Sequence, residues 1–206
     1  MKEGKFDLDR ILIASGFVGS AIFFTTMYFL LPLLYPGFDP SNQTISALGE
    51  VQSPVKTLAN VFGFSLFGIF MVFFAYGVFR SNETHILGKI ASTFFFLTGV
   101  LMYLVGIFHS ASNYSTMASL HNIVANYQFP ILATGLVLFA LDVLGNKRLR
   151  WLTPVILSLG LITLALAYVF FFTHDLENRG IWQRAAIGLP YTTMMIITVA
   201  LYRQLK

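Results

Sequence analysis

The sequence contains 206 residues, of which 56% are hydrophobic and only 11% are charged, whereas about a quarter of the residues in soluble domains are charged. This composition excludes an ordinary soluble protein and predicts a membrane protein. The net charge is +4, but the basic residues are scattered through short segments instead of forming a stripe, so nucleic acid is not an expected partner. Cysteine is absent, which excludes disulfides, thiolate metal sites and cysteine nucleophiles.

Six long apolar runs follow one another along the chain and leave no room for a soluble domain. A helix needs about 20 apolar residues to cross the roughly 30 Å hydrocarbon core of a bilayer. The predicted spans cover residues 11–35, 57–79, 90–108, 120–144, 151–173 and 181–202. The first run is too long for the apolar region of a signal peptide, about 7–15 residues, and is interpreted as an uncleaved span that ends at Pro32 or Pro36. The sequence therefore predicts an all-α, multi-pass six-helix bundle that forms one membrane domain over residues 1–206.

The lysines and arginines predict the orientation of this bundle. With both termini in the cytoplasm, ten basic residues lie inside and three lie outside, as the positive-inside rule requires for short segments. The inside set is Lys2, Lys5, Arg10, Arg80, Lys89, Lys147, Arg148, Arg150, Arg203 and Lys206. The outside set is Lys56, Arg179 and Arg184. We therefore predict a protein of the cell membrane with cytoplasmic termini and three polar loops on the outer face.

The first polar loop, from Pro36 to Gly49, concentrates turn-forming and hydrogen-bonding residues between two spans. Its candidate site residues are Asp39, Gln43 and Ser46. Ser46 is expected to cap a short helix at the membrane interface, because serine oxygens accept hydrogen bonds from the first free N–H groups of a helix. We expect this loop to cover a polar cluster at the outer end of the bundle.

The second polar loop, residues 109–122, contains no lysine, arginine, aspartate or glutamate and leads into the fourth span. His121, Asn122, Asn126 and Gln128 occupy the first turns of that span. At 3.6 residues per turn these four side chains can share one face of a helix. We expect that face to point into the bundle and to contribute His121, Asn122 and Gln128 to the polar cluster.

The third polar loop, residues 174–184, carries the candidate site residues His174, Asp175 and Arg184. An arginine at the start of a span is costly unless it is paired. Arg184 is therefore expected to pair with the first loop, with Asp39 as its carboxylate partner, or to bind a substrate carboxylate or phosphate.

Asp142, near the inner end of the fourth span, is expected to extend toward Lys147 or Arg148 at the membrane surface. A proton relay would need further acids or bases at similar depth, and the interiors of the other spans contain none. The sequence therefore argues against an ion-coupled transporter.

The polar loops carry several short motifs: Tyr35 to Pro40, Gln43 to Gly49, His121 before Ala125, and Gly180 to Arg184. These motifs resemble an uncharacterised family of six-span membrane proteins found in archaea and bacteria, one of the domain-of-unknown-function families. The resemblance implies a six-helix bundle and no particular activity. Ala47 and Gln183 stand where the family commonly has acidic residues, which removes two carboxylates from consideration.

Two kinds of function remain open for the polar cluster. The first is binding of a lipid or other small amphiphile, or service as a subunit of a membrane complex, with membrane lipids and other membrane subunits as partners. The second is a metal-dependent intramembrane hydrolase that acts on a lipid or lipid-linked substrate, with His109, His121 and His174 as zinc ligands. No cofactor is predicted in the first case; zinc, or haem with His109 and His121 as axial ligands, is the alternative.

Overall fold

The computed structural model describes residues 3–109, 116–172 and 177–205. Within them, six helical segments are long and apolar enough to cross a membrane, which confirms the predicted all-helical multi-pass fold. Each predicted span overlaps one of these segments. They are Leu8–Leu34, Lys56–Arg80, Ile86–Ile107, Thr116–Leu144, Arg150–Phe170 and Arg179–Tyr202.

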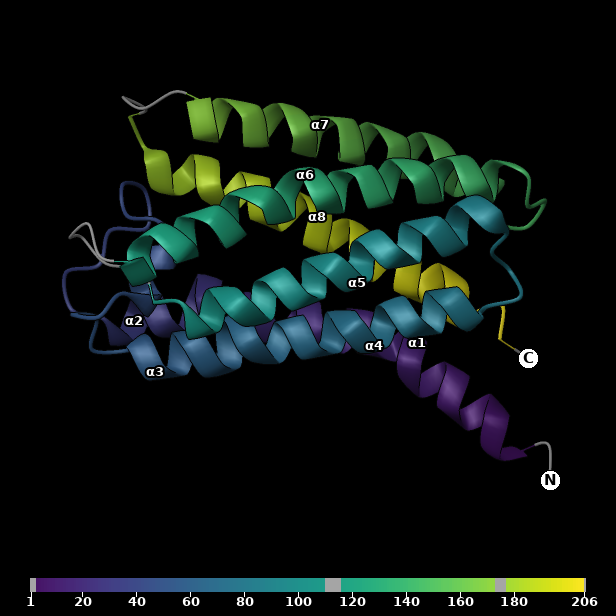
Figure 1. Cartoon of the computed structure of the whole chain (residues 1–206), viewed down its shortest axis with the longest axis horizontal. Coiled ribbons are helices and arrows are strands. Elements are labelled where there is room, and N and C mark those ends of the chain that lie inside the picture. Colours follow the sequence, from purple (N-terminus) through teal and green to yellow (C-terminus); the bar gives the residue numbers. More distant parts are fainter. Residues whose placement is uncertain (1–2, 110–115, 173–176, 206) are drawn as a thin grey trace.

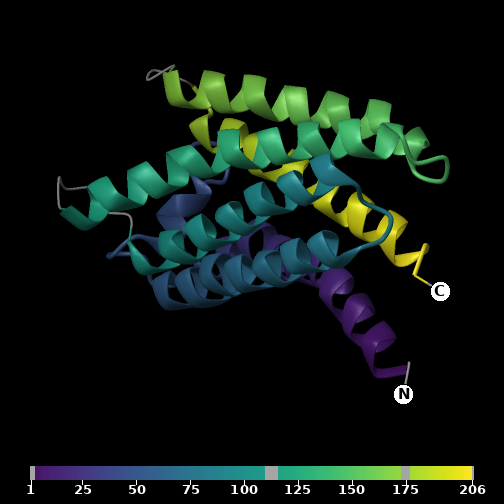
Figure 2. The same ribbon diagram turned by 45° about the vertical axis from the view of Figure 1, so that its right-hand side comes forward.

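The first span consists of three helical pieces: α1 (Glu3–Phe23), the π-helix η1 (Phe24–Leu30) and α2 (Leu31–Leu34). The expectation that Pro32 ends this span is wrong, because the chain remains helical to Leu34. Pro32 lies inside this continuous helix, just after the π-helix η1. Figure 2 shows that the first turns of α1 extend beyond the rest of the bundle.

The remaining spans follow the same order as the sequence. The second is built from α3 (Lys56–Leu58), the π-helix η3 (Ala59–Ser65) and α4 (Leu66–Arg80), and a short 3-10 helix, η2 (Ile45–Gly49), precedes it. The later elements are α5 (Ile86–Ile107), α6 (Thr116–Leu144), the 3-10 helix η4 (Arg150–Leu152), α7 (Thr153–Phe172) and α8 (Arg179–Tyr202).

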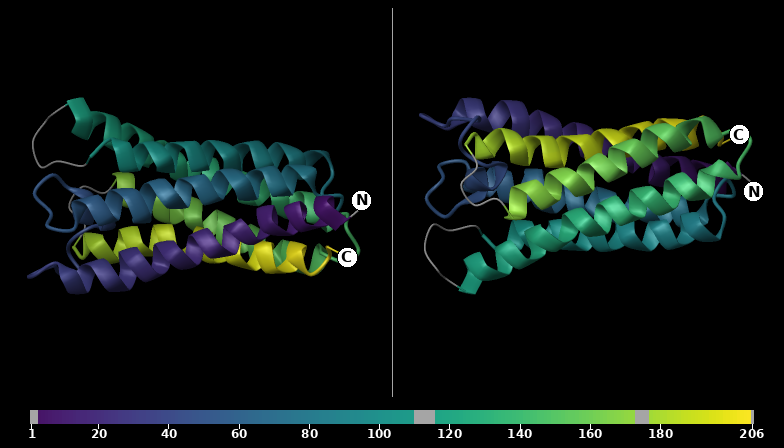
Figure 3. Two further views of the ribbon diagram at one scale, coloured as in Figure 1. Left: turned by 90° about the horizontal axis from the view of Figure 1, so that it is seen from below. Right: turned by 90° about the horizontal axis from the view of Figure 1, so that it is seen from above.

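The six spans form a closed ring in chain order. Each span packs against the next one along the sequence, and α8 closes the ring by packing against α1. Short links between consecutive helices favour such neighbours. Both termini lie at one end of the bundle (Figure 1), and the two views of Figure 3 agree. We call this the termini end, and the opposite end, which carries residues 35–55, the loop end.

Aromatic side chains fill the middle of the ring. Tyr191 of α8 is fully buried, and its ring centroid lies 4.3 Å from that of Phe67 and 5.0 Å from that of Phe23. Tilted and edge-on ring pairs at such distances are favourable. Nearby, α4 and α5 approach closely at Gly68 and Gly99, since a Cβ on Gly68 would lie 2.6 Å from the Gly99 carbonyl oxygen.

At the termini end, polar side chains join neighbouring helices. Asp142 of α6 is buried, and its Oδ2 accepts a hydrogen bond from the backbone N–H of His85 at 2.9 Å, directly before α5. The predicted extension of Asp142 toward Lys147 or Arg148 is therefore wrong: the carboxylate satisfies one of the free N–H groups at a helix start.

Two ion pairs complete this end among the described residues. Arg80 Nε donates to Asp9 Oδ1 at 2.7 Å, which joins α4 to α1. Arg148 lies 3.8 Å from the Glu83 carboxylate, which also accepts a hydrogen bond from Asn146 Nδ2 at 2.9 Å. The termini end is thus held by carboxylates that have partners.

Candidate functional site

Residues 36–49 fold into a set of turns at the loop end. Gly37 adopts a positive φ of 76°, which glycine tolerates without strain. The Asp39 carboxylate accepts hydrogen bonds from Asn42 Nδ2 at 2.6 Å and from the Ser41 N–H at 2.9 Å. These two donors lower the pKa of the exposed Asp39 carboxyl. Gln43 Oε1 accepts from the Asp39 N–H at 2.7 Å, so Asp39 and Gln43 shape the loop itself.

Arg184 of α8 holds this loop through backbone oxygens. Its Nη1 donates to the carbonyls of Pro40 at 2.6 Å, Gln43 at 2.7 Å and Gly180 at 3.1 Å, and the guanidinium lies 5.5 Å from the ring centroid of Phe38. The expected pairing of Arg184 with the first loop is present, but the ion pair with Asp39 is not formed, because that carboxylate is engaged within its own turn. Arg184 is therefore a structural anchor of the loop.

The start of α8 touches the loop directly. The backbone N–H of Ile181 donates to the Ser41 carbonyl at 3.1 Å. A Cβ on Gly180 would lie 2.8 Å from the Ser41 carbonyl oxygen and still closer to those of Pro40 and Gln43. Glycine is needed at position 180 for this close approach.

Gln183, one turn into α8, aligns the short helix η2. Its Oε1 accepts from the Ile45 N–H at 2.6 Å, and its Nε2 donates to Ser46 Oγ at 3.3 Å. The cap of η2 is Thr44, whose Oγ1 accepts from the Ala47 N–H at 3.3 Å. The prediction that Ser46 caps this helix is wrong; its hydroxyl instead faces Gln183.

A polar cavity of about 400 Å³ lies where η2, α6 and α8 meet. Amide, hydroxyl and imidazole side chains contribute most of its wall, and two phenyl rings contribute an apolar part. No carboxylate lines it among the described residues. Its lining residues are Thr44, Ser46, His121, Asn122, Ala125, Asn126, Phe129, Phe170, Arg179 and Gln183.

His121 is the most deeply buried polar group of this cavity, with 3% of its surface exposed. Its Nδ1 lies 2.6 Å from the Phe108 carbonyl oxygen, and because a carbonyl only accepts, Nδ1 carries the proton. In a neutral imidazole Nε2 is then a hydrogen-bond acceptor. This buried Nε2 has no partner among the described residues, and a buried polar atom without a partner calls for an explanation.

The structure brings together only part of the predicted cluster. Ser46, His121 and Asn122 line the cavity, together with Asn126 from the predicted polar face of α6. Gln128 is buried but does not line it. Asp39, Gln43 and Arg184 organise the loop, as described above, and His174 and Asp175 lie outside the described residues.

Sequence reasoning did not select three of the polar lining residues as site residues: Thr44, Arg179 and Gln183. Arg179 and Gln183 are four residues apart at the start of α8, so they share a helix face. This spacing is a signal that the sequence offered. The role of Thr44 depends on the fold of the loop and has no comparable pattern.

The metal and haem alternatives depend on histidines of which two are described. His109 does not line the cavity, and its Nδ1 lies 2.7 Å from the Ile107 carbonyl oxygen. The described residues contain no group of three or more histidine or acidic side chains that could hold a metal ion. The third proposed zinc ligand, His174, lies outside that part of the chain, so the zinc and haem sites stay predictions.

Comparison with known proteins gives one match. A family model described as "Protein of unknown function (DUF998)" matches residues 17–200, which confirms the predicted resemblance to a family without an assigned activity. No curated protein and no solved structure matches the chain. The function of the cavity must therefore be inferred from its geometry.

Proposed function

The chain belongs to the DUF998 family of proteins of unknown function, and we propose that it binds a hydroxyl-bearing amphiphile in the polar cavity at its loop end. One observation carries this proposal: His121, whose buried Nε2 has no hydrogen-bond partner among the described residues, is one of the residues that line a cavity of about 400 Å³. A ligand hydroxyl would donate to this nitrogen and supply the missing hydrogen bond.

The other lining groups suit a headgroup with several hydroxyls. Asn122 and Asn126 present both donors and acceptors. Arg179 adds a cation, whose guanidinium lies 5.1 Å from the ring centroid of Phe170. Since no described carboxylate lines the cavity, a neutral headgroup fits better than a metal ion or an amine.

The apolar part of the wall favours an amphiphile over a free polyol. Phe129 and Phe170 line the same cavity as the polar groups, and both belong to spans, α6 and α7. Ligand sites commonly combine such apolar walls with a few placed polar groups. An acyl chain that leaves the headgroup along these spans would remain in the hydrocarbon of the bilayer.

The basic residues support an outward-facing cavity. Arg80, Arg148 and Arg203 lie at the end of the bundle where the chain termini lie, and basic segments favour the cytoplasm. The protein contains no cysteine, so Ser41→Cys and Asn146→Cys are clean probes of the two ends. In intact cells an impermeant thiol reagent should label the first and spare the second; labelling of only the second would refute this orientation.

Native mass spectrometry tests the binding proposal with two probes of equal chain length, monooleoylglycerol and methyl oleate. Only the first carries hydroxyl groups, so the wild-type protein should retain it preferentially. His121→Asn keeps a donor for the Phe108 carbonyl but removes the Nε2 acceptor. It should weaken retention about ten-fold, the effect of one hydrogen bond.

Two further variants complete this experiment. Ala125→Phe places a ring in the cavity and should abolish retention. His109→Asn makes the same chemical change outside the cavity and should leave retention unchanged. Equal retention of both probes by the wild type, or equal weakening by the two histidine variants, would refute the proposal.

A further inference from the structure

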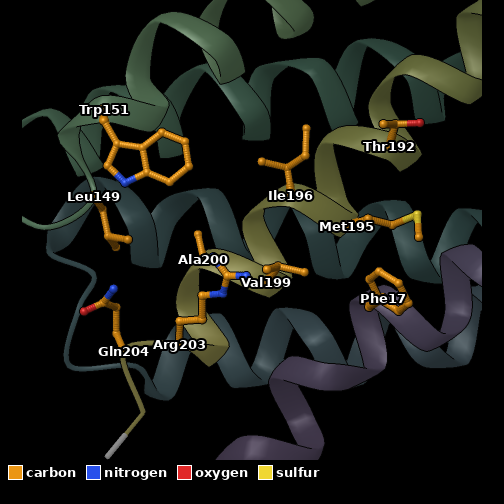
Figure 4. Close-up of a pocket in the computed structure, with 10 residues that line it drawn as sticks. All are labelled: Phe17, Leu149, Trp151, Thr192, Met195, Ile196, Val199, Ala200, Arg203 and Gln204. Carbon is orange, nitrogen blue, oxygen red and sulfur yellow. The ribbon is translucent and has the colours of Figure 1, made fainter.

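Two apolar grooves run along the outer side of α8 near the termini end. The first has a volume of about 480 Å³ and lies between α8, Phe17 of α1 and the link that carries Leu149 and Trp151 (Figure 4). The second, of about 290 Å³, lies between α8 and α1. Both are almost wholly apolar, and both are lined by Phe17, Val199 and Arg203. The two grooves are therefore adjacent, and these three side chains separate them.

The length of the first groove matches one leaflet of a bilayer. It extends from Thr192 of α8 to Gln204, two residues beyond the end of that helix at Tyr202, and the ten steps from Thr192 to Tyr202 at 1.5 Å each give roughly 15 Å. Half of a 30 Å hydrocarbon core is about 15 Å. An acyl chain of one leaflet can thus lie along the whole groove.

The end of each groove carries a cation. Arg203 lines both grooves, and Gln204 lines the first. Figure 4 shows the Arg203 side chain turned back along α8 toward Val199 and Ala200, so that its guanidinium lies over the groove. Neither of the two ion pairs among the described residues involves Arg203, and no acidic side chain lines either groove.

The aromatic wall places this end at the membrane surface. Trp151 lines the first groove and is 62% exposed. Tryptophan is enriched where the hydrocarbon core meets the headgroups, because its ring is apolar and its N–H is a donor. Trp151 and Arg203 line the same groove, so a lipid whose headgroup lies at the level of Trp151 has Arg203 in the same site.

From these features we propose that the two grooves bind one anionic diacyl phospholipid. Its phosphate pairs with Arg203, and its two acyl chains lie one in each groove, on either side of Val199. A guanidinium recognises phosphate through charge and parallel N–H donors, whereas an uncharged partner helix would offer this cation no counter-charge. The site is separate from the loop-end cavity and does not depend on its function.

Native mass spectrometry tests whether the site prefers an anionic headgroup. The protein is released from nanodiscs that contain equal amounts of phosphatidylglycerol and phosphatidylcholine. The wild-type protein should retain phosphatidylglycerol in preference to phosphatidylcholine. Arg203→Gln should reduce that preference at least five-fold. Arg148→Gln is the matched control, because it removes the same charge at the same end from a residue that lines neither groove. Equal retention of the two lipids, or equal losses in the two variants, would overturn the proposal.

A second variant tests whether the two acyl chains of the lipid occupy separate grooves. Thr192 is exposed at the far end of the first groove only, so Thr192→Trp should block one chain without disturbing the core. It should weaken retention of phosphatidylglycerol while sparing its single-chain lyso form. Equal weakening of both forms would contradict a divided site, and dimers that disappear with this variant would show that a second copy of the chain occupies the groove instead.

Discussion

The two ends of the bundle use different chemistry to close the same ring of helices. At the termini end, carboxylates have specific partners: Asp142 caps α5, and Asp9 pairs with Arg80. At the loop end, the cation of Arg184 binds backbone carbonyls, and the amide of Gln183 aligns a loop helix. The difference teaches that the described part of the loop end is joined through backbone carbonyls and amide side chains instead of ion pairs, and that some of its polar residues line a cavity.

Buried polar atoms that lack a hydrogen-bond partner among the described residues occur in both halves of the bundle, since Thr198 Oγ1 near the termini end is one of them. His121 Nε2 and Gln128 Oε1 on the first half of α6 and Arg184 Nη2 on the first turns of α8 are buried without a hydrogen bond. An unsatisfied buried group costs about 1–3 kcal/mol. Of these residues only His121 lines the cavity, so a ligand bound there can relieve the cost at that residue alone. Variants at the two ends test the difference in how the ends are joined.

The largest effect is expected from a methyl group added at Gly180 of the loop end, with Gly145 of the termini end as the control. Gly180→Ala places a Cβ against the carbonyls of residues 40, 41 and 43 and should destabilise the protein by about 3 kcal/mol. Gly145→Ala, at the termini end, meets no atom closer than 3.7 Å and should change stability by less than about 0.5 kcal/mol. Reversible denaturation in mixed detergent measures both, and similar effects at the two positions would show that the loop does not dock on α8.

A smaller loss is expected when the loop end loses an acceptor. Gln183→Ala leaves the buried Ile45 N–H without its partner and should cost about 2 kcal/mol. Gln183→Glu keeps the acceptor, and the Ser46 hydroxyl can then turn to donate, so it should cost less. Hydrogen exchange at Ile45 is the direct measurement: the alanine variant should lose protection there, and unchanged protection would exclude the bond.

The matching experiment at the termini end should give a loss of about 1.5 kcal/mol. Asp142→Ala removes the cap from the His85 N–H, and a lost cap typically costs about 1 kcal/mol, with more for a buried site. Asp142→Asn retains an oxygen acceptor and should recover most of this loss. If the asparagine variant is as unstable as the alanine variant, the negative charge of Asp142 matters more than its hydrogen bond.

The smallest effect concerns pH. Burial raises the pKa of Glu50 above its ordinary value of 4.5, so the folded protein binds this proton more tightly than the unfolded chain. The stability that comes from the protonated Glu50 carboxyl is therefore lost as the pH rises from the unfolded value of 4.5 through the higher folded pKa. Glu50→Gln should be slightly more stable than wild type at pH 7, by less than about 0.5 kcal/mol after solvent screening, and equal to it below about pH 4. A difference that persists at pH 3.5 would point to another cause.

The spans were predictable because apolar length is a strong signal, as the agreement between the predicted residues 181–202 and α8 illustrates. The grouping of His121, Asn122 and Asn126 on α6 was predictable from spacing, and these residues do share a cavity. The expectation that the whole face points into the bundle is wrong, because Asn122 and Asn126 are exposed. The partners of Arg184 and Asp142 were not, because both side chains bind backbone groups, which every residue carries and no sequence pattern marks. The role of Ser46 was missed for a similar reason, since either Thr44 or Ser46 could have supplied the capping oxygen.

The most direct measurement of the proposed cavity site is ¹⁵N NMR of the His121 ring in detergent-solubilised protein. If a ligand hydroxyl donates to Nε2, addition of monooleoylglycerol should shift the Nε2 resonance, leave that of Nδ1 nearly unchanged, and have no such effect in Ala125→Phe. Methyl oleate should cause no shift. An Nε2 resonance that does not respond to monooleoylglycerol, or that responds equally to both compounds, would contradict the proposed binding of a hydroxyl headgroup at His121.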